Sequence, residues 1–296
     1  MNVQKSFAEF AADGALYIVG TPIGNLEDMT YRAVRILKEA DCIAAEDTRQ
    51  TRKLLSHFAI SAKLYSYHEH NKQASGPELI RMIKEGKKVA LVSDAGMPAI
   101  SDPGYDLVKL AVEAGITVIP IPGPNAALSA LVVSGLPTDR FLFAGFLPRE
   151  KKKLADELER LGRIPATMLF YESPRRIGKT LEAMRSAWGN VRMAMARELT
   201  KRHEEIVRGT IDECLLYVQE HEPLGEYCLA VDLNGGKAAE SEPEHAWWEG
   251  ISIEEHVAGY ERECGDRKEA MKRAASDRGI SKRDVYQALI GKRSTN

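Results

Sequence analysis

The chain has 296 residues, of which 44% are hydrophobic and 28% are charged, and its formal net charge is −2. This length exceeds one typical domain, and the composition is that of an ordinary globular protein. The sequence excludes a membrane span, because no apolar run approaches about 20 residues, and it excludes a chain that is basic throughout.

The first half of the chain alternates short apolar runs with helical patterns. Residues 1–14 are polar and mixed and lack the apolar core of a signal peptide, so we expect a flexible tail. The alternation predicts an N-terminal α/β domain over residues 15–121, with a parallel sheet flanked by helices. Its predicted strands are Leu16–Val19, Cys42–Ala45, Lys63–Tyr67, Val89–Val92 and Thr117–Ile121, and its helices are Thr30–Glu39, Arg49–His57, Pro77–Lys84 and Tyr105–Glu113.

The proline-rich run Pro120–Pro124 ends this alternation, and Pro124 suits the first position of a helix over Asn125–Val133. We expect a second α/β domain over residues 122–238, with a mixed sheet because its strands follow one another more closely. Its predicted strands are Phe141–Phe146, Ala166–Tyr171, Val191–Ala196, Glu205–Arg208 and Tyr227–Val231, and its helices are Lys151–Leu161, Pro174–Ala187 and Ile211–Glu220. A polar linker, residues 239–250, leads to a helical C-terminal module, residues 251–296, predicted as two short helices around Gly279-Ile280-Ser281.

The turn Gly20–Leu26 follows the first predicted strand and precedes a helical pattern. Many α/β enzymes hold nucleotide-like ligands at such a strand–turn–helix. This turn has two glycines four residues apart and no third, unlike the dinucleotide fingerprint, so it suits an adenosine-like ligand better than a pyrophosphate. An ordinary connection between strand and helix is an equally good interpretation.

Two more polar segments follow strands of the first domain. In residues 91–104, Asp94 can accept hydrogen bonds from ligand hydroxyls, whereas Asp102 suits a helix cap. In residues 45–53, Asp47 suits a helix cap, and the neighbouring Arg49 can face outward from the first turn. These segments therefore fit both a ligand site and ordinary capped turns.

The second domain offers two comparable segments. Ser173 suits a helix cap with Pro174 after it, and Arg175 and Arg176 then lie at a helix start, where the helix dipole disfavours cations. That placement indicates either an anionic partner or a solvated surface pair. The dense charges of residues 196–205 most simply indicate a solvated hairpin connection.

The sequence gives no indication of a metal site. Four scattered cysteines form no CxxC pair, which fits a reducing cytoplasm rather than a zinc site or a disulfide framework. His68 and His70 are the best-spaced histidines, but no third ligand lies nearby.

Together these segments resemble the tetrapyrrole methylase superfamily of S-adenosylmethionine-dependent enzymes, and within it most closely the bacterial enzymes that methylate small-subunit ribosomal RNA. Six motifs in order, within residues 15–233, carry the resemblance. They are Gly20–Leu26, Glu46–Arg49, Ser93–Pro98, Pro122–Ala126, Phe170–Arg176 and Arg197–Lys201. The resemblance implies two α/β domains, a small helical C-terminal module, a homodimer, and a methyl donor bound in the cleft between the domains.

The resemblance also implies site residues. Those for S-adenosylmethionine are Pro22, Gly24, Asp94, Ala95, Gly96, Ile100, Ser101, Asn125, Ala126, Tyr171, Glu172 and Leu199. The porphyrin-type relatives carry Gly-Asp-Pro where this chain has Asp94-Ala95-Gly96. Motif membership and charge give Asp47, Glu198 and Lys201 as alternative proton acceptors, and Arg49, Arg175 and Arg176 as candidates for binding RNA phosphates.

The implied function is 2′-O-methylation of a cytidine ribose in the decoding region of 16S rRNA, within the small ribosomal subunit in the cytoplasm. Nine Lys/Arg against three Asp/Glu in residues 267–296 give this tail a net charge of +6, so we expect it to dock RNA; a solvated helical cap is the alternative. Two other functions stay open: methylation of a small tetrapyrrole or corrinoid, and non-catalytic RNA binding on the ribosome.

Overall fold

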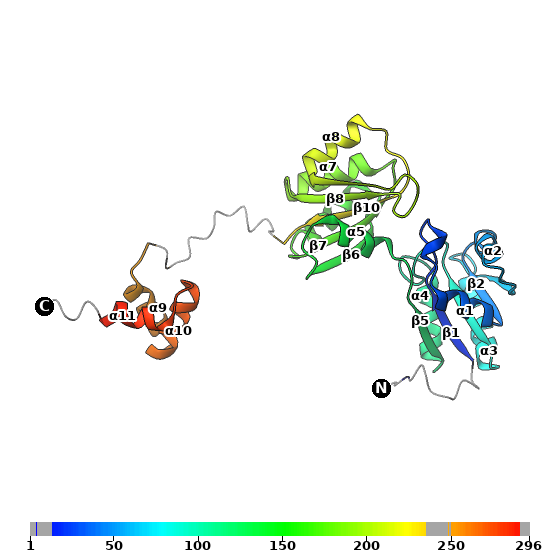
Figure 1. The fold of residues 1–296 in the computed structure, drawn as a ribbon, viewed down its shortest axis with the longest axis horizontal. Helices are drawn as coiled ribbons and strands as arrows, with labels where there is room; N and C mark the ends of the chain where they lie inside the picture. Colours follow the sequence, from blue (N-terminus) through cyan, green and yellow to red (C-terminus); the bar gives the residue numbers. More distant parts are fainter. Residues whose placement is uncertain (1–3, 5–13, 235–247, 249, 291–296) are drawn as a thin grey trace. The chain divides into compact units, whose positions relative to one another are not determined.

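The computed structural model describes residue 4 and residues 14–234, 248 and 250–290. The chain forms two compact units, residues 1–236 and residues 237–296 (Figure 1). Apart from Gln4 and Gly14, the predicted tail lies outside the described residues, as does the predicted linker apart from Trp248 and Gly250. A domain boundary near residue 121 stays a prediction.

The first sheet of the larger unit is wholly parallel, as predicted, and has the order β3-β2-β4-β1-β5. Its strands are β1 (Ala15–Val19), β2 (Cys42–Ala45), β3 (Leu64–Ser66), β4 (Lys88–Val92) and β5 (Thr117–Ile121). Side chains on both faces are buried: Leu16 and Ile18 belong to one core, and Val19 belongs to the other. Apolar runs without alternation are what a sheet covered on both faces requires.

Four helices follow strands β1 to β4, and they are α1 (Tyr31–Glu39), α2 (Thr48–His57), α3 (Lys72–Lys84) and α4 (Gly104–Glu113). The Asp47 carboxylate caps α2, as predicted. Helix α3 begins five residues before the predicted Pro77, so that prediction was wrong. Pro77 lies in the second turn, where it removes a single backbone hydrogen bond, and Gly76 before it packs close to Leu110 of α4.

The second sheet is mixed, as predicted, with the order β6-β7-β10-β8-β9. Its strands are β6 (Phe141–Phe146), β7 (Thr167–Glu172), β8 (Arg192–Arg197), β9 (Glu205–Thr210) and β10 (Tyr227–Asp232), and only the β6–β7 pair is parallel. One face packs against α6 (Lys151–Leu161), α7 (Ile177–Trp188) and α8 (Ile211–Glu220), and the other against α5 (Ala126–Ser134). These two five-stranded sheets confirm the predicted fold class.

Two predicted helix starts were wrong for the same reason. Helix α5 begins at Ala126 rather than Pro124, because the Asn125 side chain accepts the Leu128 N–H and caps it. Helix α7 begins at Ile177 rather than Pro174, after a turn over residues 173–176. A proline near a helix start marks a turn as well as a first helical residue, and the sequence does not distinguish the two.

The smaller unit contains three helices among its described residues, and the two-helix prediction was wrong. They are α9 (Ile253–Cys264), α10 (Arg267–Asp277) and α11 (Lys282–Ile290). The missed break lies at Gly265 and Asp266, where a left-handed residue ends α9 and an aspartate caps α10. Val257, Ala270, Ala274 and Val285 form a core that belongs to this unit alone.

Candidate functional site

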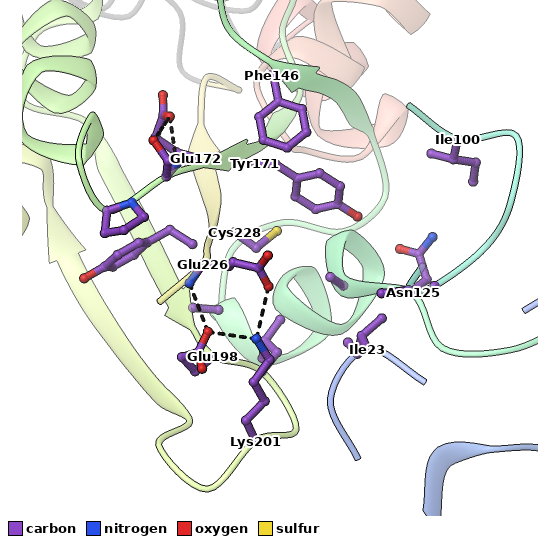
Figure 2. Close-up of a pocket in the computed structure, with 18 of the residues that line it drawn as sticks. Ile23, Ile100, Asn125, Phe146, Tyr171, Glu172, Glu198, Lys201, Glu226 and Cys228 are labelled. Carbon is purple, nitrogen blue, oxygen red and sulfur yellow. Dashed lines mark hydrogen bonds and ion pairs between the residues drawn. The ribbon is translucent and has the colours of Figure 1, made fainter. Parts of the chain in front are cut away.

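A cavity of about 490 Å³ lies in the larger unit, and residues from both sheets line it (Figure 2). Ile23 and residues 95–97 come from loops at the carboxyl edge of the first parallel sheet, where open α/β folds place their ligands. Asn125 and Ala126 come from the connection into α5, and Phe146 and Tyr171 from strands β6 and β7. The sequence motifs far apart along the chain thus meet around one space.

One wall of the cavity is backbone and small side chains. Gly96 has φ +79° and pairs with Thr21 through two backbone hydrogen bonds of 2.9 and 3.0 Å, which join the two loops. Ala95, Ala126 and Ala196 also line the space. Side chains this small let a ligand approach the main chain, whose N–H and C=O groups then become available to it.

Backbone strain is concentrated in two loops beside the cavity. Among the described residues, five non-glycines have positive φ, and four of them are Ala99, Ser101, Glu198 and Thr200. Each such residue costs of order 1–3 kcal/mol and persists only where the surrounding structure holds it. Strain of this kind gathers at ligand sites, so its position supports the cavity as the functional site.

The opposite wall is apolar and aromatic. The ring of Tyr171 lies 4.9 Å from that of Phe143 and 5.6 Å from that of Phe146, in edge-on arrangements. Leu199 and Cys228 extend this wall. Burial raises the pKa of the Cys228 thiol to about 12, so the thiol stays neutral and acts as a small apolar group rather than a nucleophile.

Charged groups of the cavity form one compact cluster. The Lys201 ammonium donates to Glu198 Oε1 at 2.9 Å and to Glu226 Oε2 at 3.1 Å, and the Glu226 N–H donates to Glu198 Oε1 at 3.0 Å (Figure 2). The bond from Lys201 lowers the pKa of Glu198. Burial alone would lower the pKa of Lys201, but its two carboxylate partners outweigh burial and raise it.

We expect this cluster to stay charged across neutral pH. Glu198 has its pKa below the ordinary 4.5, so its stabilisation is present above that value and is lost as pH falls through the folded pKa. Lys201 has its pKa above the ordinary 10.5, so its stabilisation is present below that value and is lost as pH rises through the folded pKa. The difference in unfolding free energy between the wild type and Lys201→Met should therefore be constant between about pH 6 and pH 10.

Urea unfolding of both proteins across this range measures that difference. A change in the difference near pH 7 would contradict the assignment, because one of the groups would then titrate there.

Glu172 lines the cavity, but its carboxylate is bonded elsewhere. It accepts hydrogen bonds from the Thr180 hydroxyl at 2.7 Å and the Ser173 N–H at 2.8 Å, and Arg176 Nη2 lies 3.5 Å away. The Glu172 side chain is 1% exposed. This carboxylate holds the end of β7 to the start of α7.

Glu172→Ala is expected to lower the free energy of unfolding by about 3 kcal/mol or more, because Arg176 and the hydrogen-bond donors lose a buried partner. Urea unfolding measures the change, and Glu182→Ala on the exposed face of α7 is the matched control, expected to stay within about 0.5 kcal/mol. Unchanged stability with lost ligand binding would instead give this carboxylate a direct part in binding.

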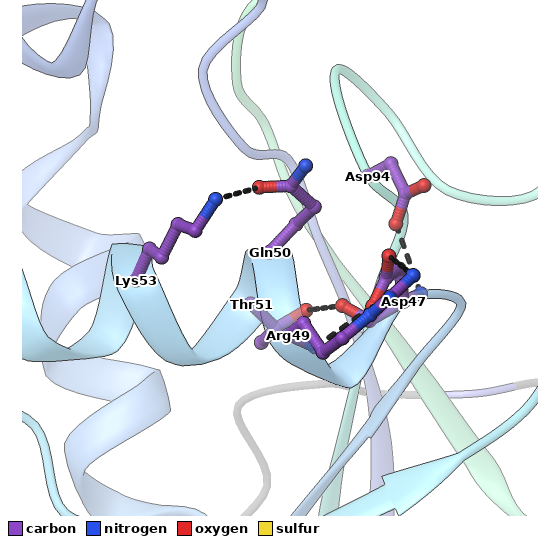
Figure 3. A network of polar contacts seen from close by, with 6 residues as sticks. All are labelled: Asp47, Arg49, Gln50, Thr51, Lys53 and Asp94. Atoms are coloured by element: carbon purple, nitrogen blue, oxygen red, sulfur yellow. Dashed lines mark hydrogen bonds and ion pairs between the residues drawn. The ribbon is translucent and has the colours of Figure 1, made fainter.

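Asp47, Arg49 and Asp94 lie together in a second network, which does not belong to the cavity lining (Figure 3). The Arg49 guanidinium donates to both oxygens of Asp47, at 3.1 and 2.9 Å, and Asp94 Oδ1 accepts the Asp47 N–H at 3.0 Å. The Arg49 side chain lowers the pKa of Asp47 to about 2. Asp94 thus joins the β4 loop to the start of α2, and Asp47 is a weak proton acceptor.

Arg175 and Arg176 have different environments. Arg175 is exposed, whereas Arg176 Nη2 donates to the carbonyls of Leu147 and Pro148, both at 3.1 Å. Arg176 therefore joins the β6 and β7 loops, which leaves Arg175 as the accessible cation of the pair.

Most of the predicted site residues line the cavity. They are Ala95, Gly96, Ile100, Asn125, Ala126, Tyr171, Glu172, Glu198, Leu199 and Lys201. Pro22, Gly24, Asp94 and Ser101 do not line it, although an added Cβ at Gly24 would strike the Lys201 side chain. The roles of all these residues stay predictions.

Sequence reasoning missed several lining residues, including Ile23, Met97, Phe146, Glu226 and Tyr227. Phe146 had a detectable signal, because it ends a predicted strand beside the others. Glu226 and Tyr227 had none: they lie at the start of β10, which runs antiparallel to β7 and so brings its amino end to this edge. Among the described residues, no cluster of His, Cys, Asp and Glu could hold a metal ion. None of the described helices has the length and apolar character needed to cross a bilayer.

Comparison with known proteins gives concordant matches. The family model "Tetrapyrrole (Corrin/Porphyrin) Methylases" matches residues 15–215. A protein of Halalkalibacterium halodurans named ribosomal RNA small subunit methyltransferase I is 54% identical over 97% of this chain and 98% of its own length. Proteins of the same name are 50% identical in Bacillus subtilis, over 96% of this chain and 97% of their own, and 42% identical in Synechocystis, over 94% and 98%.

Solved structures share the fold at low sequence identity. A uroporphyrin-III-C-methyltransferase of Thermus thermophilus matches with a TM-score of 0.54 and 20% identity, over 78% of this chain and all of that one. A diphthine synthase matches with a TM-score of 0.57 and 16% identity, over 74% of this chain and 89% of that one. At these identities the likeness concerns the fold alone.

Proposed function

The chain belongs to the tetrapyrrole (corrin/porphyrin) methylase family, and from this premise we propose that it methylates the 2′-oxygen of a cytidine ribose in the decoding region of 16S rRNA, with S-adenosylmethionine as donor. The observation that carries the proposal is the 54% identity to a small-subunit rRNA methyltransferase along nearly the whole of both chains. That match includes the C-terminal unit, which the family model does not reach. The fold supports the activity but does not identify the substrate.

The cavity fits the proposed donor in size and chemistry. Its volume of about 490 Å³ lies within the about 300–1,000 Å³ of typical small-molecule sites. Tyr171 and Leu199 offer an apolar surface for a flat adenine, and Ala95, Gly96 and Ala126 allow close approach to the main chain. S-adenosylmethionine supplies, when bound, a methyl group on a sulfonium sulfur that a ribose oxygen displaces.

We assign donor binding to the predicted residues that line the cavity: Ala95, Gly96, Ile100, Asn125, Ala126, Tyr171 and Leu199. Alignment of the two reactants and exclusion of water provide most of the rate, because the donor methyl is already activated. Of the three predicted proton acceptors, only Glu198 is both deprotonated at neutral pH and on the cavity wall, since Lys201 is held protonated and Asp47 lies elsewhere. We therefore assign Glu198 the hydrogen bond that orients the ribose hydroxyl and receives its proton.

We also propose a homodimer, which acts on the small ribosomal subunit in the cytoplasm. Leu128 and Val132 lie one turn apart on α5 and are 46% and 74% exposed, which leaves an apolar stripe for a second copy to cover. Light scattering tests this part: a monomer at micromolar concentration would refute it.

Labelled S-adenosylmethionine, incubated with the protein and either 30S subunits, naked 16S rRNA or uroporphyrinogen III, tests the function. We expect label in the 30S subunit, at a position that resists alkaline hydrolysis because its 2′-hydroxyl is blocked. Label in the tetrapyrrole alone would favour a small-molecule methylase. Binding to 30S subunits without any label would favour a non-catalytic ribosome-associated protein.

A further inference from the structure

An exposed phenylalanine lies at the mouth of the cavity. Phe146 is the last residue of β6, and its side chain is 62% exposed although it packs edge-on against Tyr171 (Figure 2). Large apolar side chains normally lose more water than this when they belong to a core. One face of an aromatic ring is thus available beside the space assigned to the methyl donor.

Cations follow Phe146 directly along the chain. Arg149, Lys151 and Lys152 are exposed, and no carboxylate pairs with them within 4.0 Å in the described part of the chain. Lys151 and Lys152 occupy the first turn of α6, where the helix dipole disfavours positive charge. An anionic partner would offset that cost.

The basic loop is held against the cavity wall. Arg176 donates to the carbonyls of Leu147 and Pro148 and approaches Glu172 at the end of β7. Strands β6 and β7 are parallel neighbours with Phe146 opposite Tyr171, so their loops leave the sheet at the same edge. Arg175, the exposed cation of the β7 loop, lies on this edge as well.

We propose that Phe146 stacks on the base of the nucleotide whose ribose is methylated, while Arg149, Lys151 and Lys152 hold phosphates of the same strand. This inference rests on the proposed function and identifies where its substrate docks. A ribose that reaches the cavity places its attached base at the mouth, and every base offers a flat face to an aromatic ring. Unpaired cations argue against a second protein chain here, because the cores of protein interfaces are depleted of charge.

Phe146→Ala should weaken binding of a single-stranded RNA oligonucleotide, and raise KM for 30S subunits, about 5- to 150-fold, which is the range for one lost stack. Phe146→Tyr should bind RNA as the wild type does, because its ring presents the same face. Phe141→Ala is the matched control, since Phe141 is 45% exposed at the other end of the same strand and does not line the cavity. Affinity for S-adenosylmethionine should be unchanged in all three.

Arg149→Gln, Lys151→Gln and Lys152→Gln should each reduce the salt dependence of RNA binding by about 0.7 per lost phosphate contact. Lys84→Gln and Lys87→Gln are the controls, because these lysines precede β4 at the opposite edge of the first sheet. Unchanged salt slopes in the three loop variants would overturn the phosphate contacts.

The outcomes separate the two proposals. If the wild type methylates 30S subunits and Phe146→Ala matches it in RNA affinity and KM, the stacking inference is overturned and the function stands. If Phe146→Ala changes the oligomeric state instead, Phe146 belongs to a contact between copies and the inference is again overturned. If the wild type labels only the tetrapyrrole, the proposed function fails and this inference fails with it.

Discussion

Replacing Gly96 with valine is expected to weaken S-adenosylmethionine binding about 100-fold, and replacing Gly115 with valine is expected to leave it unchanged. Both glycines have left-handed backbones, with φ +79° and +71°. A β-branched residue is strained at either position, so each variant should lose about 1–2 kcal/mol of unfolding free energy. Only Gly96 lines the cavity, where an added Cβ would lie 3.5 Å from Ile23 Cγ2, whereas a Cβ at Gly115 meets nothing within 4 Å.

Calorimetric titration with the donor and urea unfolding measure the two effects separately. Equal losses of donor affinity in both variants would assign the effect to general destabilisation. Wild-type affinity in Gly96→Val would remove Gly96 from the donor site, and with it the assignment of this loop.

Deletion of residues 237–296 is expected to abolish methylation of 30S subunits while donor binding is retained. The four hydrophobic cores of the larger unit contain no residue of this segment, so the truncated protein should fold. Residues 267–296 carry a net charge of +6, which is the strongest local positive charge that we find in a chain of net charge −2. Much of the affinity for rRNA should therefore be lost with it.

A full-length variant shows whether the lost activity is electrostatic. Lys268, Lys282 and Arg283 are exposed and have no ion-pair partner within 4.0 Å in the part of this unit that the structure describes. Replacing all three with glutamine should lower the salt dependence of 30S binding, because each lost phosphate contact removes about 0.7–0.9 from the slope. Methylation by the truncated protein at the wild-type rate would show that this unit is only a solvated helical cap.

Much of the fold could be predicted because the local signals agree with the final packing. The strands Thr117–Ile121 and Phe141–Phe146 and the helices Lys151–Leu161 and Ile211–Glu220 have the predicted bounds. Each combines a clear periodicity with a turn or cap at its ends. The errors at Pro77, Pro124 and Pro174 concern helix starts, where a proline fits several positions and distant packing chooses among them.

The candidate site was predictable to a smaller extent. The sequence picked out the ends of strands, and ten of the predicted residues do line the cavity. It did not determine the direction of each side chain. Glu172 belongs to the same motif as Tyr171, yet its carboxylate is bonded to Thr180 and lies beside Arg176, and Asp94 is bonded to the main chain of Asp47.

By itself, the sequence determined the element types, the parallel and mixed sheets, and the set of loops that carry polar motifs. These follow from periodicity and turn chemistry, which act over a few residues. Only the tertiary structure decided that Lys201 is held protonated between Glu198 and Glu226, that Arg176 joins two loops, and that Phe146 lies open beside the cavity. Charge state and exposure depend on neighbours that are far apart in the chain, and those neighbours are known only once the strands are paired.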